Sequence, residues 1–70
     1  MAIYSILYED DYDITNGHSS YCIIKQSTNQ ETIFEFYNSV VNKKKYPDMF
    51  IERYVQGHTA RWDDEEQTWI

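Results

Sequence analysis

The clearest hydrophobic pattern in the chain lies between Thr28 and Pro47. Apolar side chains recur there at helical spacing and form one continuous stripe: Ile33, Phe36, Tyr37, Val40 and Val41. Thr28 and Glu31 have the spacing of a capping box at its start, and Pro47 forbids continuation at its far end. The pattern therefore predicts one helix over roughly residues 29–44.

Segments on both sides of this helix carry the alternation and the β-forming residues that are typical of strands. Four strands are predicted, two before the helix and two after it, at residues 2–8, 21–26, 49–56 and 59–62. A long loop, Glu9 to Gly17, joins the first pair, with a turn signal at Asn16-Gly17. A tight turn at Gly57-His58 joins the second pair, and residues 68–70 predict a short additional pairing segment.

The element order is ββαββ, which predicts a single α+β domain over residues 1–70. We expect an antiparallel sheet of about four strands with one helix across one face. One helix cannot cover both faces of such a sheet. Four aromatic side chains are therefore expected on a partly open face: Tyr8, Tyr21, Tyr54 and Trp62.

Composition indicates where so small a domain finds its stability. Seventy residues is near the lower size limit for independent folding, and the single Cys22 excludes an internal disulfide. Aromatic residues make up 17% of the chain and supply large buried areas instead. Cys22 is expected as a small core hydrophobe on its strand. A lone thiol, with no signal-peptide or membrane-span pattern, favours the cytoplasm.

Negative charge gathers in two clusters of the chain, which has a net charge of −6. Residues 1–20 contain four acids and no Lys or Arg, and residues 63–66 are four consecutive acids. Such a field repels phosphate backbones and attracts basic surfaces. Direct nucleic-acid binding is therefore not expected. The one basic cluster, Lys43–Lys45, is interpreted as a charge complement at the helix C-terminus.

Metal binding is not predicted, although carboxylates crowd the first loop. A calcium loop starting at Asp11 needs glycine at its sixth position and glutamate at its twelfth. Asn16 and Cys22 stand there instead. His18, His58 and Cys22 lack the short paired spacings of zinc sites. The loop is interpreted as a solvated segment or a partner-facing acidic lobe, and no cofactor is expected.

Catalysis is not predicted either. Ser19, Ser20 and Cys22 lie near His18, but no nucleophile elbow or other recognised spacing surrounds them. The chain has only two glycines and no glycine-rich phosphate loop. A domain of this size also offers little room for a cleft with supporting residues. We therefore expect a non-enzymatic protein with no catalytic residues.

Two tryptophans, Trp62 and Trp69, bracket the acidic run Asp63–Glu66. Tryptophan beside charge at a surface is typical of interface anchors. The alternative is that the indole rings pack on the helix. The sequence leaves both interpretations open.

The acidic clusters on a small α+β scaffold carry a resemblance of size, charge and architecture. The chain resembles small acidic bacteriophage anti-defence inhibitors of the anti-CRISPR and anti-restriction type. The resemblance implies a non-catalytic, nucleic-acid-mimicking inhibitor of a basic-surfaced host protein, such as a nuclease, CRISPR effector or polymerase, in the host-cell cytoplasm. Lys43–Lys45 interrupts the field, so mimicry is expected only locally. The expected partner-binding residues are Glu9, Asp10, Asp11, Asp13, Trp62, Asp63, Asp64, Glu65 and Glu66.

A neutral mode of action stays open beside this one. The excess of Tyr and Trp also fits an accessory interaction module or a homodimer. Such a protein would use an aromatic sheet face or a strand edge without nucleic-acid mimicry.

Overall fold

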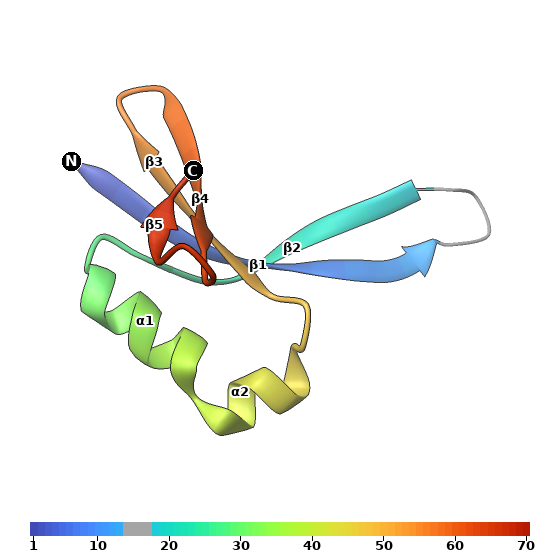
Figure 1. Cartoon of the computed structure of the whole chain (residues 1–70). Helices are drawn as coiled ribbons and strands as arrows, with labels where there is room; N and C mark the ends of the chain where they lie inside the picture. The colour runs from blue at the N-terminus through green and yellow to red at the C-terminus, as the bar shows by residue number, and fades with distance from the viewer. Residues whose placement is uncertain (14–17) are drawn as a thin grey trace.

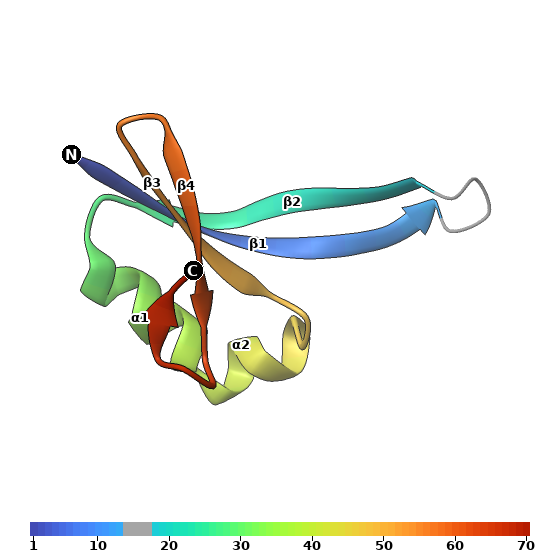
Figure 2. The same ribbon diagram turned by 45° about the horizontal axis from the view of Figure 1, so that its top comes forward.

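The chain forms an antiparallel sheet with two short helices on one side (Figures 1 and 2). The structure is a computed structural model that describes the backbone of residues 1–13 and 18–70 and the side chains of residues 1–9 and 21–70. In those residues the elements are β1 (Ala2–Asp13), β2 (His18–Ser27), α1 (Gln30–Asn38), α2 (Val40–Lys45), β3 (Phe50–Val55), β4 (His58–Asp63) and β5 (Thr68–Trp69).

The strands lie in the order β2-β1-β3-β4-β5, and every neighbouring pair is antiparallel. The predicted α+β class is therefore confirmed. The sheet has five strands instead of about four, because the pairing segment predicted at residues 68–70 forms β5, with Trp69 opposite Trp62. Two backbone hydrogen bonds of 2.8 Å between Arg61 and Ile70 extend this pairing to the last residue.

The first hairpin is longer than predicted. Residues Glu9 to Asp13 continue β1 as a strand, where the sequence suggested a loop. Their partners on β2 are uncharged or weakly basic residues, with Glu9 opposite Tyr21 and Asp13 opposite His18. Like charges therefore do not face each other across the ladder, and the pairing tolerates the acids. The turn predicted at Asn16-Gly17 lies outside the described residues.

The prediction of a single helix over residues 29–44 is wrong. The backbone leaves helical geometry at Ser39 (φ −66°, ψ 127°), which separates α1 from α2. The Asn42 side-chain amide donates to the Phe36 carbonyl at 3.1 Å, which satisfies an acceptor near the break. Val40 and Val41 beyond the break are 72% and 73% exposed. The predicted apolar stripe therefore ends at Tyr37.

Both ends of the helical region follow local chemistry. The N-cap is Asn29 instead of Thr28, and its side-chain oxygen accepts from the Glu31 amide at 2.9 Å. α2 ends at Lys45 with three lysines in its last turn. Pro47 lies two residues beyond, as the sequence predicted.

The core is small and lies between α1 and the centre of the sheet. Among the side chains that the structure describes, four are buried there: Ile6, Ile33, Met49 and Ile51. Ile6 and Ile51 face each other on β1 and β3, and Ile33 from α1 closes over them. Cys22 is exposed on β2, so its predicted place in the core is wrong. β2 is the outermost strand, which leaves this residue outside the core.

The β3–β4 hairpin turns one residue earlier than predicted. Gln56 (φ 48°) and Gly57 (φ 84°) both have positive φ, which is the geometry of a two-residue type I′ hairpin loop. His58, predicted in the turn, instead begins β4 opposite Val55.

Candidate binding surface

The face of the sheet opposite the helices is formed by alternate residues of β1 and β3. Ile6 and Ile51 point into the core, so their chain neighbours point the other way. Register then brings Leu7 opposite Phe50 and Ile3 opposite Tyr54. In the part of the chain that the structure describes, both helices lie on the other side (Figure 2). We call this uncovered side the open face.

An aromatic and cationic cluster stands on the open face. The Tyr21 ring from β2 meets the Phe50 ring edge-on, with centroids 5.5 Å apart. The guanidinium carbon of Arg61, from β4, lies over the Phe50 ring, 3.8 Å from its centroid. Edge-on aromatic pairs and cation–π contacts both favour a fixed geometry. The cluster therefore joins three strands of the sheet.

Apolar side chains on the open face are exposed to a degree that favours contact with another molecule. Their exposed fractions are 38% for Ile3, 55% for Tyr21, 58% for Ile23 and 49% for Tyr54. Neighbouring exposed apolar side chains on a small domain mark interaction surfaces more often than isolated ones do. The open face is therefore the strongest candidate for a contact surface.

Two of the four aromatic residues expected on this face lie on the covered side instead. Tyr8 is two residues from Ile6 on β1, so its side chain points to the same side of the sheet. The centroids of the Tyr8 and Tyr46 rings are 5.2 Å apart. The Trp62 ring packs against the Phe34 ring of α1, with centroids 5.0 Å apart. The expectation is correct for Tyr21 and Tyr54 and wrong for Tyr8 and Trp62, because strand alternation sends them to the helix side.

Both tryptophans belong to one aromatic group under α1. The rings of Trp62 and Trp69 are 5.3 Å apart, and Trp69 also lies 5.9 Å from Tyr4. The Arg53 guanidinium lies 4.7 Å from the Trp69 ring centroid. Of the two interpretations of the tryptophans, packing on the helix is the one that the structure displays. The two tryptophans thus pack the β4–β5 hairpin against α1.

The second acidic cluster, Asp63–Glu66, accepts several hydrogen bonds from its own chain. Asp64 accepts hydrogen bonds from the Tyr37 hydroxyl and, at 3.1 Å, from the Trp62 indole nitrogen. Asp63 accepts from the Glu65 amide at 3.0 Å. Glu65 and Glu66 stand exposed at the turn. Half of this cluster therefore shapes the turn, and two carboxylates face solvent.

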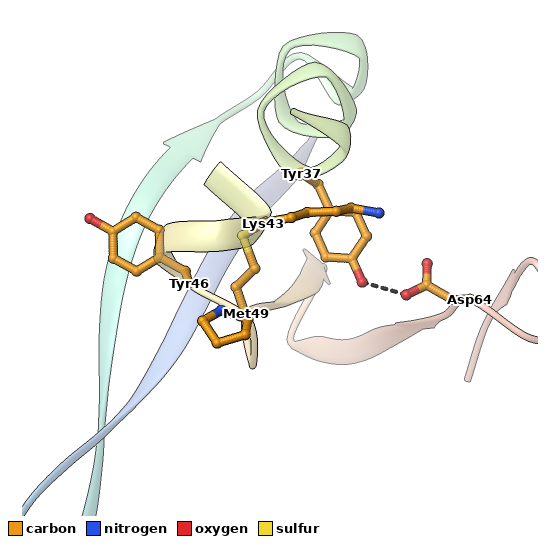
Figure 3. Close-up of a pocket in the computed structure, with 6 residues that line it drawn as sticks. Tyr37, Lys43, Tyr46, Met49 and Asp64 are labelled. Atoms are coloured by element: carbon orange, nitrogen blue, oxygen red, sulfur yellow. Dashed lines mark hydrogen bonds between the residues drawn. The ribbon is translucent and has the colours of Figure 1, made fainter. Parts of the chain in front are cut away.

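A small cavity lies beside Asp64, between the helices and the β4–β5 turn (Figure 3). Its volume is about 270 Å³, and it is lined by Tyr37, Lys43, Tyr46, Pro47, Met49 and Asp64. Burial, together with the hydrogen bond to Asp64, raises the pKa of Tyr37 to about 12. The phenol stays protonated at neutral pH and acts as a donor. The protonated phenol thus holds the Asp64 carboxylate in place at the edge of the cavity.

The first acidic cluster lies on the β1–β2 hairpin, whose far half extends away from the helices (Figure 1). Glu9 is opposite Tyr21 and two residues beyond Leu7, so it lies where the open face passes into the hairpin. Asp10, Asp11 and Asp13 continue the same strand, and their side chains lie outside the described ones. Of the four acids, the structure therefore places Glu9 at the end of the open face.

Metal ligands do not gather among the described side chains. No three of their His, Cys, Asp and Glu residues come together in a group that could hold a metal ion. His58 and Cys22 are exposed on β4 and β2. The considered calcium loop falls largely outside the described side chains. Neither described helix has the length and apolar character needed to cross a membrane.

Comparison with known proteins gave no match. No family model matches the chain, and neither the curated proteins nor the solved structures returned a similar protein. The resemblance to phage inhibitors therefore stays a prediction.

From the sequence, three residues were given no role in these surfaces. Phe50 and Arg61 form the centre of the open-face cluster, and Tyr37 anchors Asp64. A signal for Phe50 was available in the sequence, because Phe50, Glu52 and Tyr54 alternate along β3 and so share one face. The Tyr37 contact joins residues 27 positions apart, and no local pattern indicates it.

Proposed function

We propose that this chain is a non-catalytic protein that binds a basic-surfaced, nucleic-acid-handling protein and inhibits or modulates it. Binding occurs through the open face together with the acidic half of the β1–β2 hairpin. The partner is a nuclease, CRISPR effector or polymerase subunit that presents apolar side chains flanked by Lys or Arg. The chain occupies a surface that the partner otherwise offers to nucleic acid.

One observation carries the proposal: exposed apolar side chains of the open face adjoin Glu9, the first of the four acids along β1. Tyr21 is 55% exposed and lies directly opposite Glu9. Protein-binding interfaces have this arrangement, with an apolar centre and a polar rim. We infer an acidic rim, because Glu9 lies at the end of the open face and residues 1–20 contain three further acids and no Lys or Arg.

The sign of the charge selects the class of partner. Carboxylates form bidentate, charge-assisted hydrogen bonds with arginine, and opposite fields accelerate association. A surface that evolved to hold a phosphate backbone provides the complementary arginines and lysines. The apolar centre then slows dissociation, since buried aromatic anchors carry most of the binding energy.

Affinity capture from a host lysate, followed by binding kinetics on the purified partner, tests this proposal. One variant replaces Glu9, Asp10, Asp11 and Asp13 with their amides, and a second carries Tyr54→Ala. We expect the amide variant to associate more slowly and to lose most of its salt dependence. Tyr54→Ala should mainly raise the dissociation rate.

A matched control tests whether the effects are specific to the open face. Val41 is 73% exposed on α2, away from the open face, so Val41→Ala should leave both rate constants unchanged. Nucleic acid should compete with the chain for the partner. Binding that is indifferent to salt and to the amide variant would refute the electrostatic part of the proposal.

A second candidate function is an accessory interaction module without nucleic-acid mimicry. The observation that favours it is the neutral centre of the open face, where Arg61 stacks on Phe50 and lies opposite Glu52 on the neighbouring strand. For such a module Tyr54→Ala should reduce affinity far more than the amide variant does. The same two variants therefore separate the two functions.

A further inference from the structure

We propose that the cavity between the helices and the β4–β5 turn binds a small zwitterion, an α-amino acid with an apolar side chain. The carboxylate of this ligand contacts the Lys43 ammonium, and its ammonium contacts the Asp64 carboxylate. The inference goes beyond the proposed function, because the cavity lies on the helix side of the sheet and the open face lies on the other side (Figure 2).

Two opposite charges at one cavity are the first reason. Lys43 of α2 and Asp64 of the β4–β5 turn both line it. The Lys43 ammonium lies over the Tyr37 ring, 5.3 Å from its centroid, and the hydroxyl of the same ring donates to Asp64. Among the described side chains drawn in Figure 3, no hydrogen bond joins Lys43 to Asp64. Tyr37 therefore holds a cation and an anion at the cavity without pairing them directly.

Both charged groups keep hydrogen-bonding capacity for a ligand. The lysine ammonium carries only donors, and its contact with Tyr37 is to the ring face. Each oxygen of Asp64 accepts one bond, from Tyr37 or from Trp62, whereas a carboxylate offers about four acceptor positions. The Tyr37 phenol adds no charge at neutral pH, because its pKa is raised to about 12. The cavity thus presents one cation and one anion.

The sign of these charges selects a zwitterion over simpler ions. A plain carboxylate or phosphate would pair with Lys43 but would stand close to the like charge of Asp64. A plain amine would pair with Asp64 and meet the same difficulty at Lys43. A ligand that carries both charges satisfies both groups with charge-assisted hydrogen bonds.

The remaining lining and the volume indicate an apolar side chain of modest size. Pro47 and Met49 contribute apolar surface to the cavity, and Met49 is only 6% exposed. Covering such surface with an apolar group is favourable. Pockets for drug-sized ligands have volumes of about 300–1,000 Å³, whereas this cavity has about 270 Å³. An aliphatic amino acid such as leucine combines the two charges with an apolar group within this size.

Titration of the full chain with leucine, followed by NMR of the methionine methyl groups, tests the proposal. The chain has two methionines: Met49 lines the cavity, and Met1 is 97% exposed. We expect leucine at concentrations up to about 10 mM to shift the Met49 methyl signal and to leave that of Met1 in place. Isocaproate lacks the ammonium of leucine and isoamylamine lacks its carboxylate, so each should bind at least about tenfold more weakly.

Variants at the two charged positions should change which ligand is preferred. Lys43→Met keeps the stem over Tyr37 and removes the charge, so it should lose the preference for leucine over isoamylamine. Asp64→Asn should lose the preference for leucine over isocaproate. Loss of folding produces neither of these selective effects. Lys44→Met is the matched control: Lys44 is exposed and is not among the lining residues, so leucine should bind unchanged.

Three results would overturn the proposal. The first is a Met49 signal that leucine does not move. The second is equal binding of leucine and isocaproate to the unaltered chain. The third is an equal loss of leucine binding in Lys43→Met and Lys44→Met, which would make the effect one of overall charge. Circular dichroism checks that each variant is folded.

Discussion

Replacing Asp64 with alanine separates the structural contribution of the second acidic cluster from its charge. In the folded protein this carboxylate accepts from the Tyr37 hydroxyl and from the Trp62 indole. The two donors belong to α1 and β4, so one side chain ties the β4–β5 turn to the helix (Figure 3). Asp64→Ala removes both acceptors. Glu66→Ala removes a neighbouring exposed charge and no such contact.

The expected loss follows from the number and exposure of these bonds. Hydrogen bonds to a charged acceptor contribute about 1.5–3 kcal/mol each. Asp64 is exposed and water replaces part of the interaction, so we take about 2 kcal/mol for both bonds together. A domain of this size loses about 4–8 °C of Tm per kcal/mol, which gives a fall of about 8–16 °C. Glu66→Ala should change stability by less than about 0.5 kcal/mol.

Thermal unfolding at neutral pH, followed by circular dichroism, measures the difference. The near-ultraviolet signal of the tryptophan group should weaken in Asp64→Ala, since Trp62 loses its acceptor. Equal Tm values for Asp64→Ala and Glu66→Ala would refute the reasoning. The cluster would then act through its charge alone, and the link to Tyr37 would contribute nothing to folding.

Further predictions concern pH, the core and the β3–β4 turn. The pKa of Tyr37 is raised from 10.0 to about 12, so its contribution to stability is complete below pH 10 and is lost as the pH rises toward 12; Tyr37→Phe should remove this alkaline dependence in unfolding measured from pH 9 to about 12. Ile33 is fully buried, so Ile33→Ala should cost about 2–5 kcal/mol and leave much of so small a domain unfolded in a denaturant titration, whereas Val41→Ala should not. Gly57 has φ 84°, so Gly57→Ala should lower the denaturation midpoint through backbone strain alone, since a Cβ there meets open space.

Local sequence signals were sufficient where the interactions are themselves local. The start of α1 lies within one residue of its predicted position, because Asn29 and Glu31 are neighbours in the cap. The β3–β4 hairpin follows from alternation and from Gly57. Pro47 correctly predicted the end of the helical region. In each case the residues that determine the element lie within a few positions of one another.

Signals failed where a distant contact decides the outcome. The helical stripe continues through Val40 and Val41 in sequence, but the backbone turns at Ser39 and both side chains are exposed. The placement of Trp62 depends on Phe34, which is 28 positions away. Cys22 was predicted in the core from its strand alone, whereas its exposure depends on β2 being the edge strand.

The candidate surface was predictable in its chemistry and only partly in its position. The acidic hairpin was evident from residues 1–20, and Tyr21 and Tyr54 were correctly expected on an open face. The sequence did not indicate which strands lie beside the acidic hairpin. In the folded sheet β1 lies between β2 and β3, and this strand order follows from the tertiary structure. The attachment of Asp64 to Tyr37 likewise required the tertiary structure.

Methyl-resolved NMR with the captured partner tests the location of the binding surface most directly. Ile3 and Ile23 lie on or beside the open face, while Val40 and Val41 lie on α2, and all four side chains are exposed. The proposed function predicts that adding the partner shifts or broadens the methyl signals of Ile3 and Ile23 and leaves those of Val40 and Val41 unchanged. Changes at the two valines with unaffected isoleucines would contradict it.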